Sequence, residues 1–531
     1  MHRAGRQPMT ARAVVGLAMV CTLFVLVYAR ATTHGYVWDD IPTIERNPAL
    51  DGPLFEGLRA TQHSHLDPTV THLPGQQPAH ESYRPLLFLT FAAEVALFGR
   101  SPHVMHATNL ALGLAAVVLA FDVARRLLRS RSAGLFVAAV FAVHPLQVEP
   151  VCYVSARADV LAGLLALTSL TLVLRGRGAL AALAFLASLF TKEAAIGLPI
   201  VVLAGAWLLP RRTRLSASAW LVGVLPVYAM ARAALVADGP SSLANGRPIV
   251  DALLEIPGVF AQYASLFVLP RHLSTVRPLA HWTLAGFLVV GAAGLGSVVL
   301  HRRGALRGGL AGAAFGLLFS AVTLAPATVV ALMMGVAADR YAYLPVFGFA
   351  LTTAALGLHL ARGRERNRLV KLGKALAIAA PLALAWVSTK QVVTWATPGT
   401  LYANAVAVEP SSAMAHYGLG LVHATAGRWA AAMPEFRLAT QLDPTNSRAR
   451  NNLAVAYLHL GMLDLAESTL RETLAREGSY NFRAWYNLAE VHRARGQEPE
   501  SCDALRHALA INPGYARAAA DLRQCRASKS R

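Results

Sequence analysis

The stretch LFVAAVFAVHPLQVEPVCYVSARADVLAGLLALTSLTLVL, residues 135–174, decides the fold class. It consists of two apolar runs, and each approaches the length that an α-helix needs to cross a bilayer. A short polar segment separates the runs, and its ionisable side chains are His144, Glu149, Arg157 and Asp159. Ionisable groups next to membrane spans are costly and usually face a pocket. The stretch therefore predicts two membrane spans joined by a turn that lines a polar site.

The composition of the whole chain agrees with a membrane protein. Of its 531 residues, 55% are hydrophobic and 15% are charged, and the mean hydropathy is +0.44. Soluble domains carry about 25% charged residues. The chain therefore has too little charge to cover a water-facing surface of this size, which excludes a soluble globular enzyme. The net charge of +20 lies mostly in short arginine clusters between apolar segments, so it does not indicate a nucleic-acid partner.

Apolar segments predict an all-α, polytopic helix bundle with eleven spans. These segments lie at 13–30, 103–124, 132–148, 158–174, 178–192, 194–210, 215–235, 281–300, 308–326, 343–361 and 372–388. The stretch 251–269 is also apolar, but it carries Asp251, Glu255 and Pro257. We expect it to be an interfacial or re-entrant helix, because a twelfth span would move the later basic loops across the membrane.

Basic loops predict the orientation of the bundle. Arginine and lysine cluster at 125–131, 175–177, 211–214, 302–307 and 362–374. With eleven spans, all these clusters fall on the side of the N-terminus, which the positive-inside rule assigns to the cytoplasm. The first apolar segment is interpreted as a retained anchor, since no small-residue cleavage pattern follows it. We expect a multi-pass protein of the cytoplasmic membrane, with the loop 31–102 and the C-terminal region outside.

The C-terminal region carries a 34-residue period typical of tetratricopeptide (TPR) repeats. Repeats are expected at 413–446, 447–481 and 482–515, followed by a capping helix. The chain thus divides into a membrane domain at 1–390 and a TPR solenoid at 391–531. The concave face of such a solenoid is expected to bind an extended peptide or a protein; a pure packing or assembly module is the alternative. Outside the cytoplasm, the thiols of Cys502 and Cys525 can oxidise to a disulfide, with two free thiols as the alternative.

Two adjacent carboxylates, Asp39 and Asp40, follow the first span directly. Like charges at a membrane interface repel, so one of the two should hold its proton more tightly. A carboxylate in this position can accept a proton from an attacking hydroxyl. A solvated pair in a loop is the alternative interpretation.

Several cations are expected on the same membrane face as Asp39 and Asp40. They are Arg84, Arg157, Lys192 and Arg340. Guanidinium groups bind phosphate in a bidentate manner, so these side chains suit a phosphate group on a substrate. Lys192 and Glu193 are expected to form a salt bridge with each other. His144 and Glu149 offer two ligands to a divalent cation, but no metal-ligand spacing is evident, and no metal site is predicted.

The order of these motifs resembles that of the transmembrane and tetratricopeptide-repeat O-mannosyltransferases and their bacterial relatives. The motifs are Asp39-Asp40 with Asn47, Tyr83-Arg84-Pro85-Leu86, His144-Pro145 with Glu149 and Arg157-Ala158-Asp159, Lys192-Glu193, Asp339-Arg340-Tyr341 with Tyr343-Leu344-Pro345, and the TPR tail. The resemblance implies a GT-C glycosyltransferase fold and inverting transfer of a sugar, mannose in the family, from a polyprenyl-phosphate donor to a protein hydroxyl.

The resemblance also implies roles for individual residues. Asp39 and Asp40 would hold the general base. Substrate contacts would fall among Arg84, His144, Glu149, Arg157, Asp159, Lys192, Glu193 and Arg340. The donor would be the lipid-linked sugar, with no further cofactor, and the acceptor protein or peptide would bind through the TPR domain.

Two other functions fit the sequence. A non-enzymatic membrane-anchored TPR scaffold predicts that the outer acids are dispensable and the repeats essential. A transporter for lipid-linked sugars predicts ionisable groups near the middle of the membrane and broken spans. The gathering of the ionisable groups at one face favours the transferase.

Overall fold

The computed structural model describes residues 10–52, 84–205, 208–209, 211–235, 249–274, 277–278, 309–334, 336–361, 368–476 and 481–528. It confirms an all-α chain, apart from a two-residue antiparallel pairing of β1 (Arg277–Pro278) with β2 (Val336–Ala337). The described residues form two compact units that meet in sequence between Thr397 and Pro398. Each unit is described by itself.

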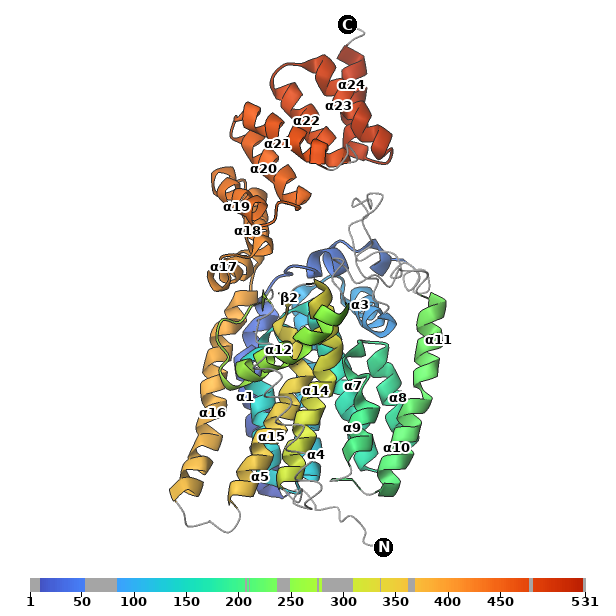
Figure 1. Cartoon of the computed structure of the whole chain (residues 1–531), viewed down its shortest axis with the longest axis vertical. Helices are drawn as coiled ribbons and strands as arrows, with labels where there is room; N and C mark the ends of the chain where they lie inside the picture. The colour runs from blue at the N-terminus through green and yellow to red at the C-terminus, as the bar shows by residue number, and fades with distance from the viewer. Residues whose placement is uncertain are drawn as a thin grey trace. The chain divides into compact units, whose positions relative to one another are not determined.

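The first unit is a bundle of helices (Figure 1). Its α-helices are α1 (Ala11–Tyr28), α3 (Pro85–Phe98), α4 (Pro102–Leu127), α5 (Arg131–Val143), α6 (Val148–Cys152), α7 (Arg157–Leu174), α8 (Gly178–Leu189), α9 (Leu198–Ala204), α10 (Arg211–Gly223), α11 (Leu225–Leu235), α12 (Ile249–Val268), α14 (Gly309–Met334), α15 (Tyr343–Ala361) and α16 (Arg368–Val392). Short helical turns join them, of which η1 (Ala29–Thr33), η2 (Ile41–Glu45), η3 (Pro48–Leu50), η4 (Pro145–Gln147), η5 (Val154–Ala156), η6 (Glu193–Ala195), η8 (Asp339–Ala342) and η9 (Val393–Trp395) are described.

Seven helical segments in the described part of the chain are long and apolar enough to cross a membrane. An eighth arises if α5 and the segment Pro145–Cys152, bent by 57° from each other, form one broken span. The segments predicted at 178–192 and 194–210 correspond to the shorter helices α8 and α9. The span predicted at 281–300 lies outside the described residues. The segment 251–269 corresponds to α12, which is not among the candidate spans and lies obliquely in Figure 1.

Glycine allows a close approach of α14 and α15. A Cβ atom on Gly348 would lie 2.5 Å from the carbonyl oxygen of Gly316, closer than real Cβ contacts. The two backbones can therefore touch only because both positions lack a side chain. This contact fixes the start of α15 and, with it, the preceding turn η8, which carries Arg340.

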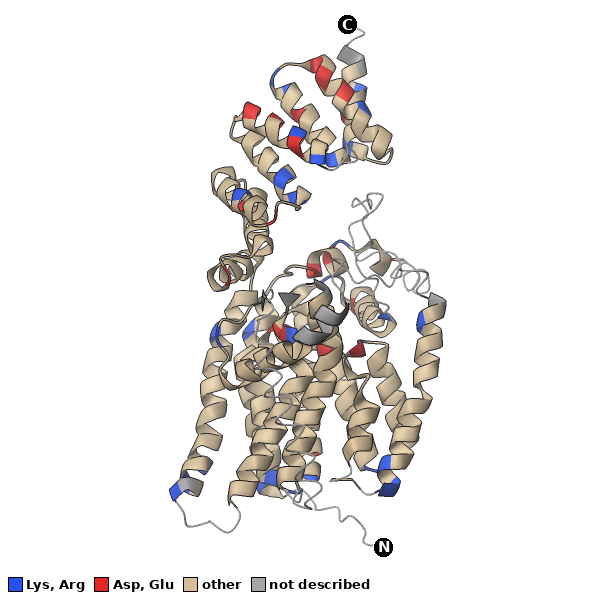
Figure 2. Ribbon diagram, in the orientation of Figure 1, with Lys and Arg blue, Asp and Glu red and all other residues tan. Residues whose placement is uncertain are grey.

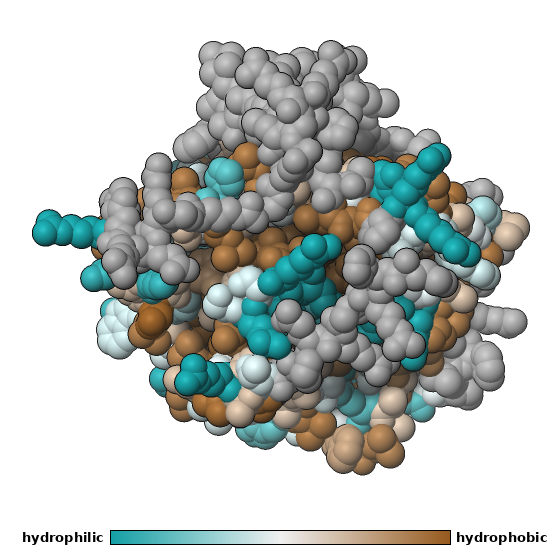
Figure 3. All heavy atoms as spheres, turned by 90° about the horizontal axis from the view of Figure 1, so that it is seen from below, coloured by the Kyte–Doolittle hydropathy of each residue, from teal (hydrophilic) through white to brown (hydrophobic). Residues whose placement is uncertain are grey.

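One end of the bundle carries an arginine cluster around a single acid. Asp122, near the C-terminus of α4, accepts hydrogen bonds from Arg125, from Arg126 at 2.8 Å and from Arg175 at 3.2 Å. We call this the arginine end. Figure 2 shows basic residues there, and Figure 3, which views the molecule from below, shows hydrophilic side chains among hydrophobic ones.

The second unit is a solenoid of paired helices. Each pair has an A helix and a B helix: α18 (Ala413–Thr425) with α19 (Trp429–Leu442), α20 (Ser447–His459) with α21 (Leu463–Arg476), and α22 (Phe482–Ala494) with α23 (Glu498–Ile511). Helix α17 (Pro398–Val408) precedes the pairs and α24 (Ala516–Ser528) follows them. Gly427, Gly461 and Gly496 lie in the left-handed region, with φ from 70° to 74°, where each A helix turns into its B helix. The helical repeats predicted for the C-terminal region are confirmed, while the predicted repeat boundaries and capping helix stay predictions.

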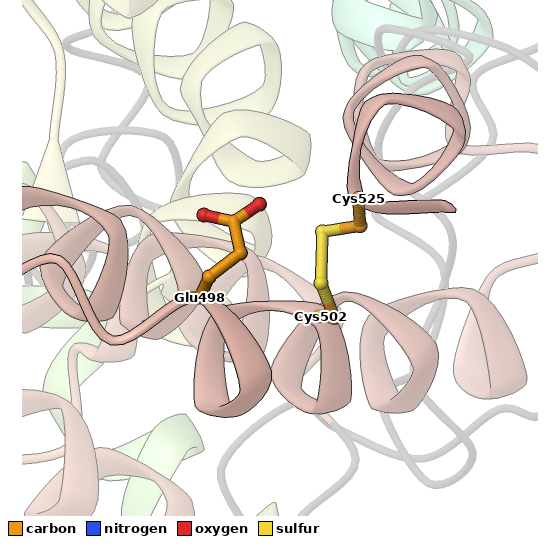
Figure 4. Close-up of side chains that lie close together, drawn as sticks. All are labelled: Glu498, Cys502 and Cys525. Atoms are coloured by element: carbon orange, nitrogen blue, oxygen red, sulfur yellow. A yellow bond between two sulfur atoms is a disulfide. The ribbon is translucent and has the colours of Figure 1, made fainter. Parts of the chain in front are cut away.

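A disulfide joins the last repeat to the capping helix. Cys502 of α23 and Cys525 of α24 are bonded, as expected from the sequence (Figure 4). Glu498 lies beside the two sulfur atoms, but a disulfide leaves no thiolate to bind a metal. The bond therefore tethers the capping helix to the repeat on which it packs.

Candidate active site

The candidate site lies at the end of the bundle opposite the arginine end. It is formed by the loop 34–40, the bent segment 144–157, the turn 190–193 and the turn 338–342, which we call the site end. The N-terminal ends of α4 and α7 meet here, whereas Asp122 and Arg175 lie near their C-terminal ends. Acidic and basic residues occur at both ends of the bundle (Figure 2).

Asp40 anchors the loop that follows α1. Its carboxylate accepts hydrogen bonds from Val37 N at 3.2 Å, from Ser155 N at 2.7 Å and from Ser155 Oγ at 2.6 Å. The side chain has no exposed surface, and burial raises the pKa of Asp40 to about 7. Asp40 therefore connects the loop to the turn η5, and its oxygen atoms are already occupied by protein donors.

Asp39 is exposed, in contrast to its neighbour. The preceding Trp38 has a φ of 52°, an uncommon conformation for a residue with a side chain. Such strain persists only where the surroundings enforce it, here through the anchor at Asp40. The result is a carboxylate at the surface of the site that acts on the neighbouring Tyr153 hydroxyl.

A wall of stacked aromatic rings borders Asp39. Trp38 stacks on Tyr153 with ring centroids 5.9 Å apart, and Tyr153 stacks on Trp395 at 5.2 Å. Burial raises the pKa of Tyr153, and the charges of Asp39 and Asp40 raise it further. The Tyr153 hydroxyl is buried and has no hydrogen-bond partner within the described structure. A buried donor of this kind is costly unless a ligand completes it.

Arg340 packs against the same wall. Its Cζ lies 5.5 Å from the centre of the Trp38 ring. Glu149 holds it, through Oε1 to Arg340 Nη1 at 2.5 Å and through Oε2 to the backbone N at 3.0 Å. The bend after α5 brings Glu149 to this position, because Pro145 starts a new turn and His144 accepts a hydrogen bond from Leu146 N. The two motifs are separated by 191 residues and form one unit of the site.

Two further cations lie near Arg340. Lys192 Nζ donates to Asp159 Oδ1 at 2.6 Å and lies 5.4 Å from the centre of the Tyr341 ring. Burial lowers the pKa of Lys192, and the nearby charges of Arg84 and Arg340 oppose its protonation further. The Nε of Arg84 is buried without a partner, and no carboxylate in the described chain forms a salt bridge with Arg84. The three cations Arg84, Lys192 and Arg340 therefore carry more positive charge than their two salt-bridge partners, Asp159 and Glu149, neutralise.

The predicted salt bridge between Lys192 and Glu193 is wrong. Lys192 pairs with Asp159, while Glu193 Oε1 accepts from Arg232 at 2.5 Å and from Tyr228 at 3.1 Å. The backbone at Lys192 is extended, so consecutive side chains point to opposite sides. Glu193 therefore faces α11, and Lys192 faces the site.

Arg157 and His144 have structural partners. Arg157 is fully buried and donates to Asn109 Oδ1 at 2.7 Å, Glu94 Oε2 at 2.9 Å and the Met105 carbonyl oxygen at 3.0 Å. His144 is buried too, and its Nε2 lies 2.9 Å from the Phe267 carbonyl oxygen. Neither side chain presents a free polar atom to a substrate, so both support the site from behind.

The sequence reasoning left Trp38, Tyr153, Tyr341 and Trp395 without a role. Tyr341 belongs to the motif Asp339-Arg340-Tyr341, and Trp38 directly precedes Asp39; these are the signals in the sequence that mark the two residues. The wall itself joins positions up to 357 residues apart, from Trp38 to Trp395, so only the fold reveals it.

Comparisons with known proteins bear on the repeats and on the family. The description "Tetratricopeptide repeat" belongs to a family model that matches residues 423–489. Human "Protein O-mannosyl-transferase TMTC1" is 32% identical over 28% of this chain and 16% of that protein. "Protein O-mannosyl-transferase F38B6.6" of Caenorhabditis elegans is 22% identical over 83% of this chain and 65% of that protein. Among solved structures, MamA matches 24% of this chain and 75% of its own at 21% identity and a TM-score of 0.23, too low to carry an argument.

The matched part of this chain spans about one sixth of the length of the human protein, and the match to the mouse protein is equally short. The match to the worm protein covers 83% of this chain. Neither unit alone makes up that share of the chain, so the match includes residues of both units. At the level of the family, the chain is therefore similar to the transmembrane and tetratricopeptide-repeat protein O-mannosyl-transferases.

Proposed function

We propose that the chain is an integral-membrane glycosyltransferase that transfers a sugar from a polyprenyl-phosphate donor to a protein hydroxyl. The observation that carries this proposal is the exposed carboxylate of Asp39, which borders an aromatic wall and a cluster of cations (Arg84, Lys192 and Arg340). Mannose is the proposed sugar, and protein the proposed acceptor, because the relatives are named protein O-mannosyl-transferases.

The reaction needs one base and no metal in this proposal. The acceptor hydroxyl loses its proton to Asp39 while its oxygen attacks the anomeric carbon of the sugar. The bond from that carbon to the phosphate oxygen breaks, and the lipid phosphate leaves with the electron pair. Attack from the face opposite the leaving group inverts the anomeric configuration. Asp39 is a better candidate than Asp40 because it is exposed, whereas three donors occupy Asp40.

The donor phosphate is proposed to bind to Arg84, Arg340 and Lys192. Arg84 forms no salt bridge among the described residues, although its charge lowers the pKa of Glu193, and its buried Nε is left to bind an anion. Glu149 and Asp159 hold the other two cations in position, at 2.5 and 2.6 Å. Charge-assisted hydrogen bonds of this kind become stronger as the leaving phosphate gains charge.

The orientation in the membrane is part of the proposal. We infer that the arginine end faces the cytoplasm and the site end and the TPR unit face outward, in the cytoplasmic membrane. Reporter fusions after residues 212, 304 and 366 should report the cytoplasm, and fusions after 240 and 400 the outside. A cytoplasmic signal at 400 would contradict the orientation.

A reconstituted transfer assay tests the activity. Purified protein in proteoliposomes would receive polyprenyl-phosphate mannose and peptides containing serine and threonine, with polyprenyl-phosphate glucose as the matched alternative donor. The expected result is a peptide carrying one hexose, found by mass spectrometry, with the mannose donor preferred. Movement of the donor across the bilayer without transfer would favour the transporter. If the protein neither transfers nor transports the sugar, and cells still require the repeats, the result would favour the scaffold.

A further inference from the structure

The ring of Tyr153 is fixed by its surroundings. The residue is buried, with 2% of its surface exposed. Its ring stacks on Trp38 with an angle of 16° between the ring planes, and on Trp395 with an angle of 26°. A buried ring that is packed in this way has no room to turn about its side-chain torsions. The fold therefore sets the position of the Tyr153 hydroxyl.

The backbone at Tyr153 is fixed too. Its N donates to the carbonyl oxygen of Glu149 at 3.0 Å, and its own carbonyl oxygen accepts from Ala156 N at 3.1 Å. Asn109 of α4 adds a third bond, from Nδ2 to the same carbonyl oxygen at 3.3 Å. These bonds tie Tyr153 to α6, to η5 and to α4. Its hydroxyl is therefore carried by helices of the bundle rather than by a loop.

The Tyr153 hydroxyl is a hydrogen-bond donor next to the acids of the site. Its oxygen is buried and makes no hydrogen bond of standard geometry among the described residues. Burial raises the pKa of Tyr153, and the charges of Asp39 and Asp40 raise it further, whereas the charge of Arg340 lowers it. A hydroxyl with a raised pKa keeps its proton. Tyr153 is therefore suited to donate a hydrogen bond and not to act as a base.

Of the two neighbouring carboxylates, Asp39 is the one available to this donor. The oxygen atoms of Asp40 are already occupied by three protein donors. Asp39 is exposed, and its backbone is held because its carbonyl oxygen accepts from Thr43 N at 2.9 Å. An ionised carboxylate has two oxygen atoms that accept hydrogen bonds. Asp39 can therefore bind the Tyr153 hydroxyl through one oxygen and face an acceptor with the other.

We propose that Tyr153 is a positioning residue for the general base: its hydroxyl donates a hydrogen bond to Asp39 and orients the carboxylate toward the acceptor hydroxyl. This inference rests on the proposed function, in which Asp39 accepts the proton. An exposed aspartate alone samples several rotamers, whereas proton transfer requires one orientation. Tyr153 gives up no proton and contacts no reacting atom. A base on a surface loop thus receives its direction from the rigid bundle.

Tyr153→Phe tests this role, since the change keeps the stacked ring and removes the hydroxyl. The single-turnover rate of transfer at saturating polyprenyl-phosphate mannose should fall by about 10- to 100-fold, the range for a hydrogen bond to a charged group. The KM for the donor should not change, because Tyr153 acts on the base. A raised KM with an unchanged rate at saturation would assign the hydroxyl to the donor phosphate and overturn the proposal.

A double-mutant cycle distinguishes positioning from a structural role. In the Asp39→Asn background no base remains to be oriented, so adding Tyr153→Phe should lower the residual rate no further. Residues that act independently give additive effects. The same fold-loss from Tyr153→Phe in both backgrounds would therefore overturn the proposal.

Tyr28→Phe is the matched control. Tyr28 of α1 is fully buried, and its hydroxyl also has no hydrogen-bond partner among the described residues. Tyr28→Phe should transfer sugar at the wild-type rate, and an equal loss in both variants would overturn the proposal. A wild-type protein that transfers no sugar would reject the proposed function itself. Wild-type rates in Tyr153→Phe, with an active wild-type protein, would reject only the role of Tyr153.

Discussion

The two ends of the membrane unit use ionic groups in opposite ways. At the arginine end, one carboxylate, Asp122, is shared by three arginines, and each ionic partner is near the end of its own helix. At the site end, the acids Glu149 and Asp159 each hold one cation in place. There the exposed acid Asp39 and the cation Arg84 form no salt bridge among the described residues, although the charge of Arg84 lowers the pKa of Glu193.

The difference separates charges that serve insertion and stability from charges available for chemistry. A carboxylate already shared by three arginines has little capacity left for a substrate. An unpaired acid and an unpaired cation, held by neighbours that are themselves paired, retain their full capacity to exchange a proton or bind an anion. Four predictions follow from this contrast, and they begin with the largest expected effect.

Asp39→Asn should lower the rate of sugar transfer by about 10²–10⁴-fold, the usual contribution of a general base. The change keeps the size of the side chain, so membrane insertion and donor binding should be unaffected. The measurement is single-turnover transfer with saturating donor. Glu45→Gln, an exposed acid in the same loop, is the control and should transfer at the wild-type rate. A wild-type rate in Asp39→Asn would remove Asp39 from the mechanism.

Arg84→Gln should raise the KM for the lipid-linked donor by about 10-fold or more, because a charge-assisted hydrogen bond contributes about 1.5–3 kcal/mol. The rate at saturating donor should fall less than the affinity. Arg46→Gln, an exposed arginine in the loop after Asp40, should leave both quantities unchanged. An unchanged KM in Arg84→Gln would place the phosphate elsewhere.

Asp40→Asn should change the pH dependence of stability. The pKa of Asp40 is raised to about 7 from an ordinary value of 3.8, so its protonated form favours the folded state. This contribution is fully present below about pH 4 and is lost as the pH rises to about 7. Wild-type protein should therefore gain thermal stability from Asp40 between pH 8 and pH 5, and the variant should lack that gain.

Asp51→Asn is the control for the pH experiment, because its partner Arg100 lowers the pKa of Asp51. That contribution has the opposite sign: it is present above the ordinary pKa and is lost as the pH falls. Thermal unfolding followed by tryptophan fluorescence at several pH values measures both variants. Identical pH profiles for the wild type and Asp40→Asn would show that Asp40 does not titrate in this range.

Asp122→Asn should have the smallest effect on sugar transfer, although it should lower stability, because a buried carboxylate shared by three arginines is lost. Transfer should continue at the wild-type rate, because this residue lies at the arginine end. Parallel measurements of thermal unfolding and transfer would check both statements. A loss of transfer without a loss of stability would mean that the two ends are not functionally distinct.

The sequence predicted the elements more reliably than their partners. Apolar length and the 34-residue period reveal helices and repeats because both are local properties. The pair Asp39 and Asp40 was also found, but the pattern could not distinguish them. Their difference depends on Ser155, 115 residues away, which donates to Asp40 and leaves Asp39 exposed.

The same reason explains the mistakes. Lys192 pairs with Asp159 rather than with its neighbour Glu193, because an extended backbone separates adjacent side chains. The substrate contact predicted for Arg157 stays a prediction, but the sequence did not indicate its ion pair with Glu94, which lies 63 residues away and carried no motif. A sequence shows which residues are charged and roughly how far they lie from a membrane span. Which acid pairs with which base depends on how helices that are distant in the sequence pack together.

Photo-crosslinking of the donor tests most directly whether the site end carries the function. A polyprenyl-phosphate sugar with a photoreactive group near the phosphate would be bound to the wild-type protein, activated by light and mapped by mass spectrometry. The account predicts labels within residues 34–40, 153–159, 190–193 and 338–343, with less labelling in Arg84→Gln. Labels concentrated around Asp122 and Arg175, or on the TPR unit, would contradict it.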